Sequence, residues 1–200
     1  GFKSGQYRFR PENKASNWTT GYNFPAVKAG MINKETISSE NPVPMQALVM
    51  NMRRSIFQDI RVRQALSKAY DFEWMNKTLF HGQYERLQSF FHGSELAATG
   101  KPSIEEMKVL TPLLSKLEPI QRQAVLMEWQ LPTSDGSGFN REGLLEARQL
   151  LLDAGFYYND MKLYQPDGKL AQIEILMTGE TMGRVLLPYI RNLKRLGFDV

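Results

Sequence analysis

Cysteine is absent from the 200 residues of the sequence. This absence excludes thiol catalysis, disulfide bonds and cysteine-rich zinc sites, and it fits both a cytoplasmic protein and an exported bacterial protein that uses no disulfides. Long apolar runs are also missing, because none approaches the roughly 20 residues that a membrane-spanning helix requires. Composition alone therefore leaves the compartment open.

Catalytic patterns are missing as well. The two histidines, His81 and His92, are eleven positions apart with no cysteine nearby, which disfavours a metal pair. No serine lies in a Gly-x-Ser-x-Gly motif, and no pair of carboxylates stands out from ordinary surface charge. The glycines at 136–138 lack the spacing of a phosphate-binding loop. We therefore expect no catalytic residue, no cofactor and no metal.

The charge balance is mildly basic, with a net charge of +4 and a pI near 9.2. Such a surplus could serve an anionic partner, for example nucleic acid, an anionic membrane surface or a carboxylate ligand. The basic residues are spread along the chain with acidic residues between them, which is typical of a solvated surface. A basic nucleic-acid-binding α/β module remains as the alternative function, and its affinity would fall steeply with salt.

Residues 53–71, RRSIFQDIRVRQALSKAYD, predict a helix with an arginine-rich beginning. Asp59 occupies the N-cap position, where its carboxylate can accept first-turn N–H groups. Asp71 then caps a second short helix, which we expect to end at Gly82. One apolar stripe of helical period runs through the first helix and consists of Val62, Ala65, Leu66, Ala69 and Tyr70.

The segments on either side of these helices predict strands and further helices. Residues 45–52, MQALVMNM, form a short apolar run after two prolines, which is typical of a buried strand. Residues 103–106, SIEE, match a capping box, and the helix that starts there should stop at Pro112. Residues 132–138 predict a loop, after which Asn140 caps a helix that ends at Gly155. The apolar stripe of that helix is Leu144, Ala147, Leu151 and Ala154.

The last forty residues predict a parallel crossover. A Pro-Asp-Gly turn separates a short strand from a strand at 170–177, in which Ala171, Ile173, Ile175 and Met177 share one face. A helix follows from about Thr181, with a kink at Pro188 and an end at Gly197, and the final residues begin a strand. Strand, helix and strand in this order require parallel pairing, which predicts an α/β fold. Because the sequence stops three residues into that strand, we expect a truncated C-terminus.

Several ordered motifs resemble one known family. The stretch NMRRSIFQDIRVRQALSKAYDFEWMNKTLFHGQY is similar to the signature of extracellular solute-binding proteins that serve peptide-importing ABC transporters. ARQLLLDAGF and LKRLGFDV resemble later elements of that family, while QYERLQSFFHGSELAATGKPS and YRFRPENKASNW resemble its YejA-like oligopeptide-binding branch. The positions that match the signature are Asn51, Phe57, Asp59, Val62, Arg63, Ala65 and Asp71.

The resemblance implies a fragment of a two-lobed periplasmic binding protein (type II, cluster C), with a mixed sheet and flanking helices. By this likeness residues 1–44 are the irregular tail of the first lobe, 45–52 a crossover strand near the hinge, and 53–200 an incomplete second α/β lobe. The implied function is to bind oligopeptides in the interlobe cleft and deliver them to ABC permease subunits in the inner membrane. It also implies a monomeric, exported, non-enzymatic protein whose signal peptide lies outside this fragment.

The arginines near the first helix have two interpretations. Arg61 and Arg63 are expected to pair with acids such as Asp59 and Asp71 and to fix the start of the helix. Arg53 and Arg54 follow the predicted crossover strand, so they are either surface charge or a planar fork for a peptide carboxylate.

Loop aromatics and polar groups complete the expected site. The aromatic residues without helical period either pack into a core or line the cleft. Polar residues in the loop at 84–95 could bind peptide N–H, C=O and terminal groups. The predicted ligand-binding residues are Asn51, Arg53, Arg54, Trp18, Tyr22, Tyr84, Arg86, Ser89, Phe90, Ser94 and Glu95, together with the neighbouring aromatic Phe91 in the same loop.

Overall fold

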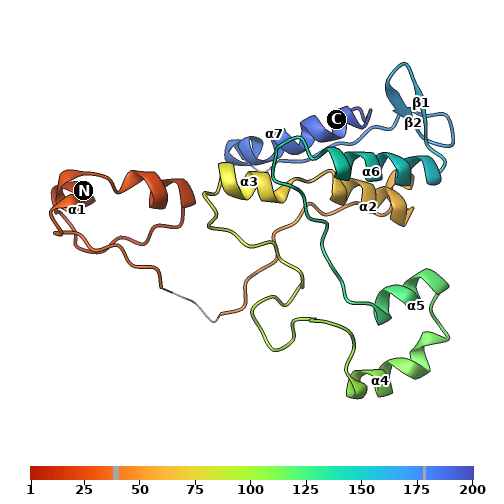
Figure 1. Cartoon of the computed structure of the whole chain (residues 1–200), viewed down its shortest axis with the longest axis horizontal. Helices are drawn as coiled ribbons and strands as arrows, with labels where there is room; N and C mark the ends of the chain where they lie inside the picture. The colour runs from red at the N-terminus through yellow and green to blue at the C-terminus, as the bar shows by residue number, and fades with distance from the viewer. Residues whose placement is uncertain (38–40, 178) are drawn as a thin grey trace. The chain divides into compact units, whose positions relative to one another are not determined.

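A computed structural model describes residues 1–37, 41–177 and 179–200 of the chain (Figure 1). The chain divides into two compact units. In the described residues, no helix combines the length and the apolar character that crossing a membrane demands. The first unit consists of Gly1–Thr36, Val49–Glu85 and Pro132–Val200, and the second of Ile37–Leu48 and Arg86–Leu131.

The two capped helices of the first unit form as their sequences predict. Helix α2 (Ile60–Lys68) begins at Asp59, whose Oδ1 accepts the Arg61 N–H at 2.8 Å. Helix α3 (Phe72–Thr78) begins at Asp71, whose Oδ1 accepts the Trp74 N–H at 3.1 Å. The predicted end of α3 is wrong, because Gly82 lies beyond the helix in a turn with φ 72°. Its N–H bonds to the Asn76 carbonyl at 2.8 Å, so the chain folds back before Gly82 can act as a C-cap.

Helix α6 (Arg141–Asp153) packs against α2 and builds the centre of the core (Figure 1). Ala65 of α2 and Ala147 of α6 are both fully buried, and such small side chains let two helices approach closely. Asn140 lies at the N-cap position but makes no capping bond; its Nδ2 donates instead to the Lys68 carbonyl at 2.7 Å. The helix ends as predicted, with Gly155 at φ 85°.

A β-hairpin follows α6; its second strand is the short strand predicted before the Pro-Asp-Gly turn, whereas its first strand was not predicted. Strand β1 (Tyr157–Asn159) pairs antiparallel with β2 (Lys162–Tyr164). Asp160 and Met161 form the two-residue turn, and both have positive φ, at 47° and 63°. Two positive φ angles match the twist of a two-residue hairpin turn. Such turns usually contain glycine, and because this one does not, the sequence gives no sign of the turn.

The predicted parallel pairing is confirmed as an isolated bridge, but the predicted strand at 170–177 is wrong, because the structure assigns no strand to these residues. Tyr164 pairs antiparallel with Leu170 across the Pro-Asp-Gly turn. Gln172 pairs in parallel with Asp199, with the Ile173 N–H bonding to the Asp199 carbonyl at 2.8 Å. Ala171 and Ile173 are buried, but Met177 at the far end of the predicted strand is 48% exposed. Met177 lies beyond Gln172, the residue of this stretch that pairs with Asp199.

Helix α7 (Glu180–Arg195) makes the crossover and closes the core, with Pro188 inside it. Leu186, Tyr189 and Leu193 are buried on its apolar face, as its period predicts. Tyr189 Oη donates to the Leu66 carbonyl at 3.1 Å, and Asn192 Nδ2 donates to the Ala69 carbonyl at 2.9 Å. These bonds satisfy carbonyls at the end of α2 that the helix itself leaves open.

The predicted strand at residues 45–52 is wrong. The described structure assigns no strand there, and Val49 is 92% exposed. Within the described parts of the chain, no backbone hydrogen bond links residues 45–50 to a neighbouring segment. An apolar run forms a β-strand only when a neighbouring strand makes backbone hydrogen bonds with it. The periodicity of the run does not reveal whether such a neighbour exists. The α/β character rests on the crossover and its helices.

The second unit and the N-terminal segment contain short helices. The capping box at Ser103 and Glu106 is confirmed at the start of α4 (Ile104–Leu114). Pro112 does not stop this helix as predicted; it lies inside, near the end, where it interrupts a single hydrogen bond of the last turns. Helix α5 (Pro119–Leu126) was not predicted. The described part of the N-terminal segment contains the short helices η1 (Phe2–Ser4), η2 (Asn17–Gly21) and α1 (Pro25–Lys28).

Candidate peptide-binding residues and the family of the chain

Arg61 pairs with the carboxylate at the start of α2, as predicted. Its Nη2 lies 2.6 Å from Asp59 Oδ2, and its Nε lies 3.0 Å from Asp59 Oδ1. The hydrogen bond from the Arg61 side chain lowers the pKa of Asp59 below its ordinary value, against the opposing effect of burial. The cap carboxylate is therefore held in its charged form.

Arg63 has different partners from those predicted. Its Nη1 donates to the carbonyls of Phe57 and Gln58, both at 2.8 Å. These carbonyls belong to the short helix η3 (Ser55–Phe57) and the residue after it, so Arg63 ties that turn to α2. Its role is structural, as predicted, but it bonds to backbone oxygens and not to an acid.

Asp71 also departs from the prediction, because it anchors a loop and not an arginine. It is only 4% exposed, and its Oδ2 accepts the Gly138 N–H at 3.1 Å. Ser134 Oγ donates to both Asp71 Oδ1 and Glu73 Oε2. The loop at 132–138 is therefore hydrogen-bonded to the first turn of α3. This contact joins residues more than sixty positions apart, so no local sequence pattern predicts it.

The predicted site residues around 51–54 lie on the surface of the first unit. Asn51 Oδ1 accepts the Arg53 N–H at 3.1 Å and its Nε at 3.4 Å, which closes a local turn. Arg54 Nη1 lies 3.7 Å from Glu174 Oε2, and both side chains are exposed. Because exposed pairs of this kind contribute little, the Arg54 guanidinium can exchange Glu174 for another carboxylate.

The predicted aromatic residues of the first unit make local contacts. Trp18 and Tyr22 are half-buried with ring centroids 6.2 Å apart, and Lys34 Nζ lies 4.4 Å from the Trp18 ring. Tyr22 Oη donates to Glu12 Oε2 at 3.1 Å. Tyr84 packs on Phe80 at a centroid distance of 4.5 Å. The half-buried rings of Trp18 and Tyr22 are compatible with both predicted roles, core packing and lining of a cleft.

The loop of the second unit presents aromatic rings to solvent. Phe90 is 77% exposed, so core packing is excluded for it in this unit, and Phe91 is exposed too. Ser89 Oγ accepts the N–H groups of Phe91 and Ala98, both at 3.2 Å. Ser94 Oγ donates to the Phe91 carbonyl at 2.7 Å, so both serine hydroxyls hold the loop together. Arg86 is half-buried and Glu95 is exposed.

The predicted site residues are thus divided between the units. Within each unit these residues lie in local groups: Trp18 packs with Tyr22, Asn51 bonds to Arg53, and Ser89 and Ser94 bond within one loop. The first unit holds Trp18, Tyr22, Asn51, Arg53, Arg54 and Tyr84, and the second holds Arg86, Ser89, Phe90, Ser94 and Glu95.

Comparison with known proteins shows the family. Residues 1–200 match the model "Bacterial extracellular solute-binding proteins, family 5 Middle". The "Probable peptide-binding protein YejA" of Agrobacterium fabrum is 39% identical over 99% of this chain, and the chain spans 32% of that protein's length. The "Peptidoglycan-binding protein YepA" of the same organism is 34% identical over 98% of the chain and 33% of its own length.

Two further comparisons differ in sequence identity and in coverage. The "Uncharacterized protein YejA" of Escherichia coli is 33% identical over all of this chain and 33% of its own length. Among solved structures, NikA from Brucella suis, with Fe(III)-EDTA, gives a TM-score of 0.46 at 18% identity, over 75% of this chain and 24% of that one. Nothing in these relatives supports the nucleic-acid alternative. On its full-length family match, the chain belongs to the family 5 bacterial extracellular solute-binding proteins.

Proposed function

We propose that the protein to which this chain belongs binds oligopeptides in a cleft between two lobes and delivers them to the permease subunits of an ABC importer. The observation that carries the proposal is the likeness to the "Probable peptide-binding protein YejA", at 39% identity over 99% of the chain. Its place would be the periplasm, facing an inner-membrane permease, and its working form a monomer. Residues 1–44 would end the first lobe, 45–52 would run near the hinge, and 53–200 would form an incomplete second α/β lobe.

The exposed side chains of the described units support this proposal. Arg53 and Arg54 are exposed cations, and a guanidinium offers parallel N–H donors to a peptide carboxylate. Phe90 is an exposed aromatic ring that can cover peptide side chains without strong sequence preference. A binding role requires no catalytic group, which agrees with the absence of a catalytic motif in the sequence.

A second candidate ligand is a peptide attached to a peptidoglycan fragment. The observation that favours it is the name of the relative YepA, "Peptidoglycan-binding protein", at 34% identity. Both ligands share peptide N–H, C=O and carboxylate groups, so the same side chains could serve either.

The test is calorimetric titration of the intact protein with mixed oligopeptides and, separately, with peptide-bearing peptidoglycan fragments. Saturable binding of the oligopeptides is expected. Binding of the fragments alone would replace oligopeptides by the second candidate, and binding of neither would refute the proposed function.

A further inference from the structure

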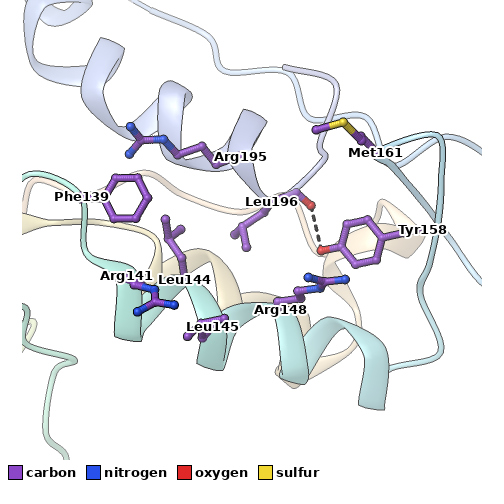
Figure 2. Close-up of a pocket in the computed structure, with 9 residues that line it drawn as sticks. All are labelled: Phe139, Arg141, Leu144, Leu145, Arg148, Tyr158, Met161, Arg195 and Leu196. Carbon is purple, nitrogen blue, oxygen red and sulfur yellow. Dashed lines mark hydrogen bonds between the residues drawn. The ribbon is translucent and has the colours of Figure 1, made fainter.

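A hollow in the first unit lies outside the proposed peptide-binding residues. It has a volume of about 590 Å³ and lies between α6, the β1–β2 hairpin and the end of α7 (Figure 2). This volume falls in the range of roughly 300 to 1,000 Å³ that small-molecule sites occupy. Because it shares no residue with the predicted peptide site, its occupant can be inferred separately.

Three arginines surround the hollow, and no carboxylate lines it. Arg141 and Arg148 come from α6, and Arg195 comes from the last turn of α7 (Figure 2). Within residues 1–37, 41–177 and 179–200, none of the three forms an ion pair. The hollow therefore concentrates positive charge that the described part of the chain does not neutralise.

Aromatic rings hold two of these arginines in place. Arg195 Cζ lies 4.5 Å from the centroid of the Phe139 ring, and Arg148 Cζ lies 4.7 Å from that of Tyr158. Tyr158 is itself fixed, because its Oη donates to the Leu196 carbonyl at 3.1 Å (Figure 2). Arg195 Nη1 also donates to Asn192 Oδ1 at 3.0 Å, and the other N–H groups at the edge of a stacked guanidinium remain able to bind an anion.

Apolar side chains form the rest of the lining. Leu144 and Leu196 are buried beneath it, while Leu145 is exposed at its side. An inorganic anion would use the arginines and leave this apolar surface in water. A neutral apolar molecule would cover the surface and leave the arginines without a counter-charge. The lining fits a molecule that has both parts.

We propose that this hollow binds a small organic anion with a hydrophobic body, such as a carboxylate or sulfonate on an aromatic or aliphatic skeleton. Arg148, beside Tyr158, and Arg195, beside Phe139, lie on opposite sides of the hollow, so one of the two binds the anionic group while the leucines between them cover the skeleton (Figure 2). This second site goes beyond the proposed peptide binding and does not depend on it.

The test uses two fluorescent probes that share one skeleton. Anilinonaphthalene sulfonate carries the anionic group, and phenylnaphthylamine lacks it. Titration of the intact protein at low salt should show saturable binding of the sulfonate. At least one of Arg148→Gln and Arg195→Gln should weaken it about threefold to tenfold, as loss of a charge-assisted contact predicts. Arg184→Gln, an exposed arginine earlier in α7, is the matched control and should not change the affinity.

Several results would overturn the proposal. They are absence of saturable sulfonate binding, equal affinity for the neutral probe, and unchanged affinity in both variants. Displacement of the sulfonate by oligopeptides, with no effect of the arginine changes, would place the probe in the peptide cleft and also overturn it. If one of the two variants loses its thermal transition, the other variant decides under the same criterion. Peptide affinity, measured on the same variants, separates this site from the proposed function.

Discussion

Asp71 Oδ2 accepts a hydrogen bond from the Gly138 N–H at 3.1 Å, and this bond joins the start of α3 to a loop more than sixty positions later. Gly138 has φ 83°, and a Cβ on it would lie 2.6 Å from Trp74 Nε1. The loop can approach the carboxylate only because residue 138 has no side chain. The contact explains why Asp71 is buried although it carries a charge.

Gly138→Ala should therefore destabilise the protein more than Gly136→Ala. Both glycines have positive φ, which costs an alanine roughly 1 to 2 kcal/mol. A Cβ at Gly136 meets nothing closer than 3.6 Å, so that variant carries the backbone cost without the clash. Urea unfolding of the two variants measures the difference. Equal midpoints would show that the Trp74 ring moves aside freely.

Asp71→Asn should lower the free energy of unfolding by about 1 to 3 kcal/mol, because a buried acceptor of several N–H and O–H donors is partly lost. Asp135→Asn is the control in the same loop, since Asp135 is exposed and bonds to the nearby Ser137 N–H at 3.0 Å. Chemical denaturation of both variants decides the point. A control that costs as much as Asp71→Asn would contradict the anchoring role.

Acid should weaken the protein partly through Asp59. The Arg61 side-chain bond lowers the pKa of Asp59 in the folded state below its unfolded value. Its contribution is therefore present above the unfolded pKa of about 3.9 and is lost as the pH falls through the lower folded pKa. Asp59→Asn should show a shallower loss of stability over this acidic range. Parallel curves of unfolding free energy against pH for wild type and variant would refute the linkage.

In the intact protein, replacing Arg63 should mainly affect stability, whereas replacing Arg53, Arg54 or Arg86 should mainly affect peptide affinity. Arg63→Ala removes the bonds to the Phe57 and Gln58 carbonyls, so it should lower the melting temperature more than it changes ligand affinity. In contrast, at least one of Arg53→Ala, Arg54→Ala and Arg86→Ala should weaken peptide binding tenfold or more, since a charge-assisted contact contributes about 1.5 to 3 kcal/mol. Calorimetry and thermal melting of the four variants give both quantities. Unaltered affinity in all three would leave these arginines as surface charge.

The isolated chain should bind oligopeptides weakly or not at all. It spans 32% of the length of the YejA relative, and a cleft with part of its walls missing offers fewer contacts while the cost of ordering the ligand is unchanged. Calorimetric titration with mixed oligopeptides should give little heat. Tight, saturable binding by these 200 residues would contradict the two-lobe proposal.

The sequence by itself determined those elements that are stabilised by interactions between residues close together in the chain. The apolar stripes of α2, α6 and α7, the caps at Asp59 and Asp71, and the positive φ of Gly155 all follow from residues within a few positions of each other. The parallel pairing of Gln172 with Asp199 was predictable too, because the crossover has only one favourable arrangement. The family signature covers the same elements.

Tertiary structure alone decided where distant groups meet. The run at 45–52 has the composition of a strand but lacks a described partner, so it leaves Val49 exposed. Arg63 bonds to backbone carbonyls, and Asp71 bonds to the N–H of a glycine in a distant loop. A buried or half-buried polar group bonds to the donor or acceptor that tertiary packing places beside it. The arginines of the hollow at α6 and α7 come from segments about fifty residues apart. Such contacts depend on packing geometry, which no spacing along the chain encodes.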